Sequence, residues 1–177
     1  MKEKQERFLQ LYEPIHDRFE RFCRAKLYGR TTVMEYSDLI NDSLIIAFEK
    51  LDTLKSEKAF LSFLFGIAIR ILSNHTKKKK EERLTFDGQS LGVPDVNDQT
   101  ALSAELHFLY KALNQLNDEQ RESIILFEIS GFSIKEIAEL HQSSESAVKQ
   151  RLKRGKEKLL LILEDNEIIK EKEVTNG

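Results

Sequence analysis

Apolar residues recur at intervals of three and four along most of this chain, which is the spacing of a helix face buried against a core. One such series runs from Phe8 to Phe22 and another from Leu39 to Leu51. A third, over residues 59–80, is apolar around most of its circumference and ends in the run Lys77 to Lys80. Only seven Gly and two Pro interrupt these patterns, so the sequence predicts an all-α protein.

The composition changes after the third predicted helix. Residues 85–105 carry four acidic side chains and no basic one, together with two Gly and Pro94. A compact domain seldom contains so long an irregular stretch, so we interpret it as a linker. We therefore predict two small helical domains joined by an extended acidic linker. The predicted bounds are 1–83 for the first domain, 84–104 for the linker, 105–164 for the second domain and 165–177 for a charged, frayed tail.

The second domain begins with a leucine-rich helix over residues 102–116 and continues into a capped one. Asn117 and Gln120 have the spacing of a helix N-terminal cap. Gly131 follows the next apolar series, and glycine readily adopts the left-handed conformation that ends a helix. The sequence thus predicts two further helices before residue 131.

Residues 133–158 then predict a helix-turn-helix with a polar turn. Ser133 and Glu136 have capping-box spacing at the start of a short helix, in which each side chain satisfies a backbone donor. The segment from His141 to Ser144 supplies the turn, with Ser143 or Ser144 as the next N-cap. Successive residues of a helix are rotated by about 100° around its axis, and four apolar residues of the second helix fall within an arc of about 60°. They form a stripe that is predicted to be buried, namely Val148, Leu152, Gly155 and Leu159.

The rest of this second helix is polar, with six Lys or Arg against one Glu between residues 149 and 158. Glutamine, arginine and lysine read base edges in the major groove, and flanking cations suit the phosphates on either side. A solvated helix on a bundle surface is the alternative explanation of such a charge run. The capped helix and turn before it favour DNA. The candidate duplex-binding residues are Ser144, Ser146, Lys149, Gln150, Arg151, Lys153, Arg154 and Lys156.

The overall charge argues against a protein that holds DNA alone. The net charge is -2 and the pI about 6.1, although Lys and Arg together number 28. Phosphate neutralisation supplies much of the affinity of DNA-binding proteins, and a free-standing one is usually more basic. We therefore expect an assembly partner to help this chain bind DNA.

Several other classes of protein are disfavoured. The single Cys23 excludes an internal disulfide and a cysteine-cluster zinc site, and its apolar neighbours predict a buried residue. The four histidines have no metal-ligand spacing, so we expect neither a metal site nor an enzyme such as a nuclease. The charged N-terminus lacks the apolar centre of a signal peptide, and no apolar run approaches membrane-span length. We expect a soluble, cytoplasmic protein.

With these motifs in view, the chain resembles the extracytoplasmic-function (ECF) class of bacterial RNA polymerase sigma factors. Residues 113–159 resemble the fourth conserved region of that family, which reads the promoter -35 element. Residues 37–51 are similar to the part of the second region that docks on a coiled coil of the polymerase, and residues 59–80 to the part that melts and reads the -10 element. Positions matching the fourth region are Leu116, Arg121, Gly131, Glu136, Ile137, Ala138, Val148, Lys149, Leu152 and Arg154.

The resemblance implies two sets of site residues in the first domain. Those expected to bind polymerase are Asp38, Leu39, Asn41, Asp42, Leu44, Ile45 and Phe48. Those expected to bind the melted -10 strand are Lys55, Ser56, Lys58, Phe60, Phe63, Arg70, Asn74, Lys77 and Lys78. A single strand can be held by aromatic stacking together with cations along its backbone. Phe60 and Phe63 also lie on the main apolar stripe, which favours the core for both.

The resemblance further implies a transcription initiation factor with no catalytic site, cofactor, small-molecule substrate or membrane insertion. Its partners would be core RNA polymerase, promoter DNA and an anti-sigma factor, since such a partner commonly holds this class inactive. One departure from the family is Gln142, where the turn usually has Gly, because a positive φ would strain a glutamine. The alternative function is a polymerase-independent helix-turn-helix regulator. The acidic pair Asp38 and Asp42, set in an apolar helix, favours a docking surface instead.

Overall fold

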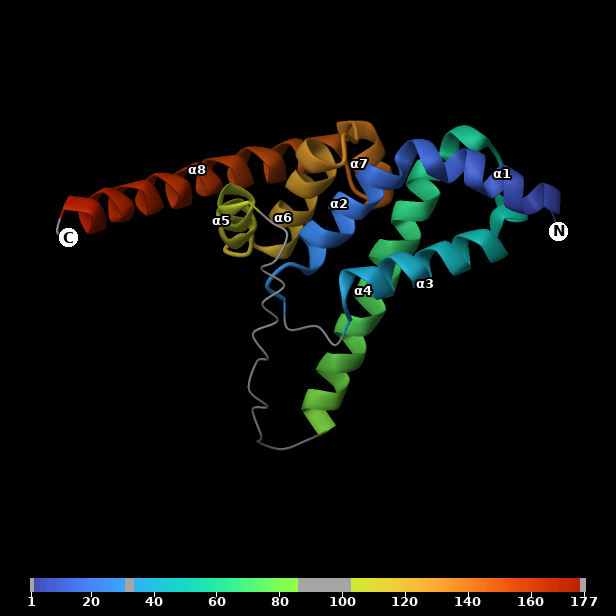
Figure 1. The fold of residues 1–177 in the computed structure, drawn as a ribbon, viewed down its shortest axis with the longest axis horizontal. Helices are drawn as coiled ribbons and strands as arrows, with labels where there is room; N and C mark the ends of the chain where they lie inside the picture. Colours follow the sequence, from blue (N-terminus) through green and yellow to red (C-terminus); the bar gives the residue numbers. More distant parts are fainter. Residues whose placement is uncertain (1, 31–33, 86–102, 176–177) are drawn as a thin grey trace. The chain divides into compact units, whose positions relative to one another are not determined.

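The computed structural model describes residues 2–30, 34–85 and 103–175, and the regular structure in these ranges is helical (Figure 1). Side chains are described as far as Lys78 and Asp165 in the two longest helices. The chain divides into two compact units. Unit 1 comprises Met1–Leu27 and Thr31–Pro94, and unit 2 comprises Tyr28–Arg30 and Asp95–Gly177. Most of the predicted acidic linker lies outside the described residues.

Unit 1 is built from four α-helices and three short 3-10 turns in its described part. In chain order they are α1 Lys2–Tyr12, η1 Glu13–Ile15, α2 His16–Leu27, α3 Tyr36–Glu49, η2 Leu51–Thr53, η3 Glu57–Ala59 and α4 Phe60–Thr85. The apolar series from Phe8 to Phe22 is therefore two helices rather than one. Pro14 lies in the intervening turn, and proline cannot donate the backbone hydrogen bond that a continuous helix needs.

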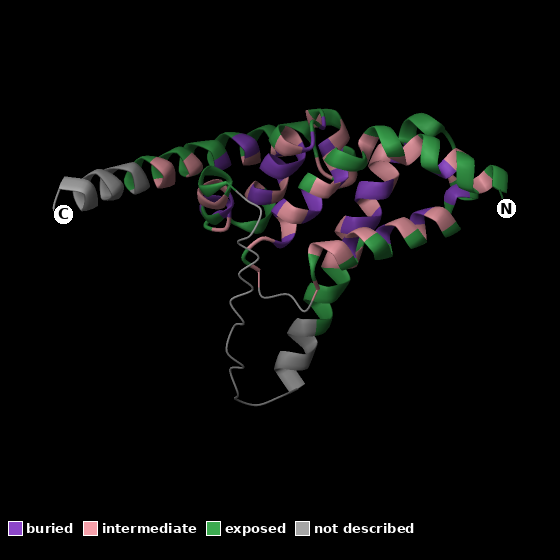
Figure 2. Cartoon of the chain, viewed as in Figure 1, coloured by how far each residue is buried: buried purple, intermediate pink, exposed green. Residues whose placement is uncertain are grey.

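The core of unit 1 is aromatic where α2 and α4 meet. The rings of Phe19 and Phe65 lie 5.1 Å apart, and those of Phe22 and Phe65 lie 4.8 Å apart. Leu39 of α3 and Leu64 of α4 are fully buried beside them. The buried segments of α2, α3 and α4 are purple in Figure 2. Each predicted apolar face thus packs inward, and Cys23 is buried as expected.

The helical stretch Glu57–Lys78, which comprises η3 and most of α4, is long and apolar enough to cross a membrane by length and composition. The prediction that no apolar run approaches span length was therefore wrong. Five residues of this stretch are nevertheless buried within unit 1, namely Phe60, Leu64, Phe65, Ile67 and Ala68. The core helix of a soluble protein passes the same test of length and composition, and 28% of the apolar window is buried.

Unit 2 is a second helical bundle. Its elements are α5 Ala104–Leu113, α6 Asp118–Ile124, the π-helical turn η4 Ile125–Ile129, α7 Ile134–Leu140 and α8 Glu145–Thr175. Buried residues from all five elements form the core, including Leu113, Ile124, Leu126, Ile137 and Val148. Asn117 caps α6 by accepting a hydrogen bond from the Gln120 amide at 2.9 Å, as its spacing predicted. Gly131 has a φ of 68°, which confirms its left-handed conformation.

The C-terminal end of α8 corrects a prediction. We expected a frayed tail from residue 165, but the helix continues to Thr175. Residues 156–175 contain neither Gly nor Pro and are rich in Glu, Lys, Leu and Ile. These residue types favour helix, and no stop signal is present to end it.

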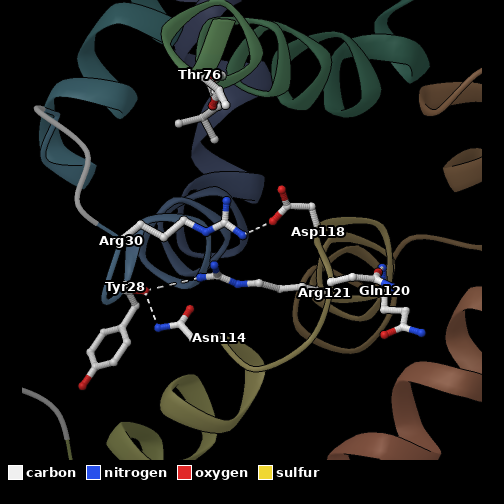
Figure 3. A network of polar contacts seen from close by, with 9 residues as sticks. Tyr28, Arg30, Thr76, Asn114, Asp118, Gln120 and Arg121 are labelled. Atoms are coloured by element: carbon white, nitrogen blue, oxygen red, sulfur yellow. Dashed lines mark hydrogen bonds and ion pairs between the residues drawn. The ribbon is translucent and has the colours of Figure 1, made fainter. Parts of the chain in front are cut away.

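A buried arginine of unit 2 lies within a network of polar contacts (Figure 3). Arg121 of α6 is 2% exposed, and its Nη2 donates to the Tyr28 carbonyl oxygen at 3.4 Å. Asn114 Nδ2 donates to the same oxygen at 2.9 Å, while Arg30 pairs with Asp118. Burial, followed by the nearby charge of Arg30, lowers the pKa of Arg121 to about 10. The guanidinium therefore stays charged at neutral pH, and it shares the Tyr28 carbonyl oxygen with Asn114.

Candidate nucleic-acid interface

The first helix of the predicted helix-turn-helix begins where the sequence indicated. Ser133 Oγ accepts a hydrogen bond from the Glu136 amide at 3.2 Å, and the Ser133 amide donates to Glu136 Oε2 at 2.8 Å. This is the reciprocal capping box. Ile137 and Ala138 are buried, so α7 packs its predicted face inward.

The turn between α7 and α8 is closed by backbone hydrogen bonds and includes one left-handed residue. Gln142 has a φ of 49°, the conformation that the expected glycine would adopt without strain. The Ser143 amide donates to the Ala138 carbonyl oxygen at 2.9 Å, which closes the turn around it. Ser144 Oγ accepts from the Ala147 amide at 3.1 Å, so Ser144 rather than Ser143 caps α8.

The turn is also tied to α6 by a partly buried acid and base. His141 Nε2 lies 2.8 Å from Glu122 Oε1, with side chains 11% and 18% exposed. The pair becomes an ion pair when the imidazole is protonated. The end of α7 is thereby anchored to the helix that precedes the motif.

Helix α8 divides into a buried stripe and an exposed polar face. Val148, Leu152 and Gly155 are buried, as predicted, and Leu159 is partly buried. Seven of the eight candidate duplex-binding residues are exposed: Ser144, Ser146, Lys149, Gln150, Lys153, Arg154 and Lys156. Their side chains project away from the core of unit 2, as a major-groove helix requires. Their role in binding DNA stays a prediction.

Two of the candidate residues are engaged with carboxylates. Arg151 Nε lies 3.1 Å from Glu119 Oε2, and the Arg151 side chain is 22% exposed. Lys156 Nζ lies 2.5 Å from Glu128 Oε1. No local pattern predicts these partners, because they come from α6 and η4 rather than from α8.

These contacts are possible because α6 and α8 approach closely at Gly155. A Cβ atom built on Gly155 would lie 2.8 Å from Ile124 Cδ1 and 3.3 Å from Gln120 Cβ. A larger residue fits there only if the Ile124 side chain shifts and Gln120 gives way slightly. Gly155 therefore permits the close packing of α6 against the predicted reading helix.

In unit 1, most of the predicted -10 residues lie on exposed surface. Arg70, Asn74, Lys77 and Lys78 are exposed on α4, and Lys55, Ser56 and Lys58 are exposed in the segment before it. Phe63 is partly buried. Phe60 is 2% exposed and its ring lies 5.6 Å from that of Phe8, so this residue belongs to the core and cannot stack on a base.

Two ion pairs, which no sequence pattern predicted, join α1 to the segment before α4. Lys4 Nζ lies 2.6 Å from Asp52 Oδ2, and Arg7 Nε lies 3.0 Å from Glu57 Oε1. Lys4 also lies over the ring of Phe48 at 5.3 Å. These pairs join residues about fifty positions apart, which no local pattern can predict.

The predicted polymerase-binding residues fall on the exposed side of α3 with one exception. Asp38, Asn41, Asp42 and Ile45 are exposed, and Leu44 and Phe48 are partly buried. Leu39 is fully buried in the core of unit 1, because it shares the inward stripe with Ser43 and Ala47. It is therefore removed from the candidate surface.

An open hollow lies between α3 and α4, beside these exposed residues. It has a volume of about 300 Å³ and is lined by Asp42, Ile45, Ile46, Ile71, Asn74 and His75. Ile45 is 57% exposed at this site. The hollow brings Asp42, predicted to bind polymerase, together with Asn74, predicted to bind DNA.

Comparison with known proteins supports the fold and the helix-turn-helix region. Residues 109–159, which include α6, α7 and the first half of α8, match the family model for sigma-70, region 4. The ECF RNA polymerase sigma factor SigX of Bacillus subtilis is 29% identical over 162 residues, covering 85% of this chain and 80% of SigX. SigW of the same organism is 26% identical over 173 residues, covering 91% of each chain.

A solved structure shares the fold. The sigma factor RpoE, crystallised with the anti-sigma factor NepR from Bartonella quintana, superposes with a TM-score of 0.74 at 24% identity. The match covers 93% of this chain and 98% of RpoE. The match to sigma-70, region 4, and the ECF sigma factors among the relatives support the role of an RNA polymerase sigma factor in promoter-directed transcription initiation. Sigma factors are transcription initiation factors rather than enzymes.

Proposed function

We propose that this sigma factor contacts a promoter at two points. Helix α8 of unit 2 would enter the major groove of the -35 element, and the exposed part of α4 with the segment before it would hold the melted -10 strand. The single observation that carries the proposal is the exposed face of Gln150, Lys153 and Arg154, opposite a buried stripe. We propose the same functional division of the chain as the sequence predicted, with residues 1–83 and 105–164 as the two domains.

Reading of the -35 duplex rests on side-chain chemistry. An arginine donates two hydrogen bonds to guanine, and a glutamine pairs with adenine, in the major groove. Arg154 and Gln150 supply these two groups one helical turn apart, and Lys149 and Lys153 add charge for the phosphates. The capped start of α8 at Ser144 also presents backbone amides that suit a phosphate.

Polymerase binding rests on the exposed part of α3. Asp38, Asn41 and Asp42 provide acidic and amide groups, and Ile45 provides an exposed apolar side chain beside the hollow. Such a mixed surface, with an apolar centre and a polar rim, is typical of a protein interface. Assembly with polymerase also explains how a chain with a net charge of -2 can hold promoter DNA.

Binding of the melted strand rests on the cations of α4. Arg70, Lys77 and Lys78 are exposed on the same helix as Asn74, and Phe63 is the remaining aromatic candidate for stacking. Helix α4 continues to Thr85, beyond the last turn in which a helix dipole favours cations, so the dipole does not account for these lysines. Their combination with an exposed amide and a polar loop favours a strand-binding surface.

We further propose that the protein acts in the cytoplasm, has no catalytic step of its own and is held inactive by an anti-sigma factor. The solved relative RpoE was crystallised with such a partner. A protein that binds core polymerase and promoter DNA works where transcription occurs, which supports the proposed location.

The test is reconstitution with purified core RNA polymerase. The full chain should co-elute with core polymerase in gel filtration and should direct initiation from a promoter selected by that assembly. Replacing Asp42 with Lys should weaken co-elution, whereas replacing Gln150 should leave it unchanged. Tight, specific duplex binding by the chain alone, without polymerase association, would instead support the polymerase-independent regulator.

A further inference from the structure

Two cations on opposite edges of the proposed reading face are each neutralised by an acidic residue from outside α8. Glu119 of α6 engages Arg151, and Glu128 of η4 engages Lys156. We propose that Glu119 and Glu128 withhold these cations from DNA phosphates and so limit the affinity of unit 2 for duplex DNA. This inference rests on the proposed function, because it concerns the regulation of the same face.

Arg151 is held by two elements at once. Its Nε lies 3.1 Å from Glu119 Oε2, and its Nη1 donates to Ser143 Oγ at 3.3 Å. An arginine that binds a phosphate uses two parallel N–H groups of its planar fork. Here the α6 carboxylate and the turn hydroxyl each take one side of that fork. Arg151 of α8 therefore connects this helix to both α6 and the turn.

Lys156 is held in a comparable way on the other edge. Its Nζ lies 2.5 Å from Glu128 Oε1 and 5.2 Å from the centre of the Phe127 ring. A carboxylate and an aromatic face together satisfy an ammonium group without DNA. The Lys156 side chain is still 50% exposed, so Glu128 neutralises its charge without shielding it from solvent.

The backbone keeps both carboxylates in place. Glu119 adjoins Gln120, and Glu128 lies one helical turn beyond Ile124, so the two ion pairs flank the close approach at Gly155. Exposed ion pairs of this type contribute little to stability. Their principal consequence is electrostatic, because they neutralise two cations at the edges of the reading face, whereas Lys149, Lys153 and Arg154 form no ion pair with the described residues.

The consequence for function is a sigma factor that binds DNA weakly until polymerase supplies the rest of the contacts. Each phosphate that a protein neutralises steepens the fall of log K with log salt by about 0.9 for duplex DNA. Releasing Arg151 or Lys156 from its carboxylate should therefore add up to about 0.9 each to that slope. The predicted gain is independent of DNA sequence, because phosphates carry no sequence information.

The experiment measures binding of the full chain to a mixed-sequence DNA duplex of about three helical turns, by fluorescence anisotropy across a KCl series. E119Q and E128Q should each bind more tightly at low salt, with a steeper slope. R151Q alone should leave the slope of the original protein nearly unchanged, whereas K149Q should reduce it by about 0.9. Combining R151Q with E119Q should abolish the gain from E119Q. E105Q on α5 is the matched control for removing one exposed acidic charge and should give no steeper slope.

Three outcomes would overturn the inference. R151Q could reduce the slope as much as K149Q does, which would make Arg151 a phosphate ligand despite Glu119. The gain from E119Q could persist in the E119Q/R151Q variant, which would make it a general effect of charge. The E119Q/E128Q variant could also fail to bind the duplex at the lowest salt. These titrations contain no polymerase. Co-elution with core polymerase tests the proposed function in a separate experiment, so the two failures can be distinguished. Circular dichroism of each variant confirms that it is folded.

Discussion

Gly155 of α8 faces Ile124 of α6 so closely that a Cβ atom would lie 2.8 Å from Ile124 Cδ1. Replacing Gly155 with Ala should therefore destabilise unit 2, even though alanine is the better helix former by about 1 kcal/mol. Forcing a methyl group into a packed contact typically costs about 1 to 3 kcal/mol, so we expect a net loss of about 1 kcal/mol. Urea unfolding of the full chain, followed by circular dichroism, measures this loss. Glu157→Ala, at an exposed position of the same helix, is the control and should change stability by less than about 0.5 kcal/mol.

Gln142 is the strained position of the helix-turn-helix. Its φ of 49° lies in the left-handed region, which costs a residue with a side chain about 1 to 2 kcal/mol. Gln142→Gly should stabilise unit 2 by up to about 1 kcal/mol, because part of the relief is offset by the greater entropy of glycine in the unfolded chain. Gln142→Ala keeps the strain and should give no such gain. Equal stabilisation by Gly and Ala in thermal unfolding would show that the backbone conformation is not the cause.

Cys23 should make the protein less stable in alkali. Burial, followed by the charge of Glu20, raises the pKa of this thiol above its ordinary value of 9.0. Above pH 9.0 the unfolded chain therefore releases a proton that the folded chain retains, so the free energy of unfolding falls as pH rises. The slope contributed by this thiol approaches about 1.4 kcal/mol per pH unit.

The measurement compares the unfolding free energy of the original protein and Cys23→Ala between neutral pH and pH 10. The alanine variant loses packing at every pH, so only the difference in slope is informative. We expect a flatter alkaline decline for Cys23→Ala. Parallel curves for the two proteins, or rapid alkylation of Cys23 in the folded state, would contradict a buried neutral thiol.

Helix ends were predictable from the sequence because the side chains that set them are local. Ser133 with Glu136, and Asn117 with Gln120, lie three residues apart and bond as that spacing predicts. The stripe of Val148 and Leu152 is buried for the same reason, since angular position within a helix follows directly from residue number. Pro14 is a local signal as well, because it separates α1 from α2 within the apolar series.

Long-range partners could not be predicted in this way. Glu119 and Arg151 are 32 residues apart, and their pairing depends on the approach of α6 to α8 at Gly155. The sequence placed Gly155 on the buried stripe without indicating which helix it would meet. Likewise, the hollow that joins Asp42 to Asn74 depends on the packing of α3 against α4. Ion pairs such as Arg7 with Glu57 carry no sequence signature at all.

The reading face of α8 yields the most specific functional prediction. Arg154 and Gln150 are exposed one turn apart on the side opposite the buried stripe, where each could reach a base edge. Replacing either with Ala should weaken promoter binding by the assembled polymerase by about 1 to 3 kcal/mol. The loss should be confined to promoters with the preferred base at one -35 position, because a bidentate contact discriminates among bases.

The measurement is competition binding of the reconstituted polymerase to a set of promoters with single base-pair changes in the -35 element. If Arg154 reads a base, polymerase with the Arg154→Ala variant should lose its base preference at one -35 position. It should retain its preference at the other positions. Lys149→Ala, at the edge of the same face, should instead weaken all promoters alike and reduce the salt slope by about 1. A uniform loss from Arg154→Ala would reassign Arg154 to a phosphate and leave Gln150 as the residue of this turn that reads a base.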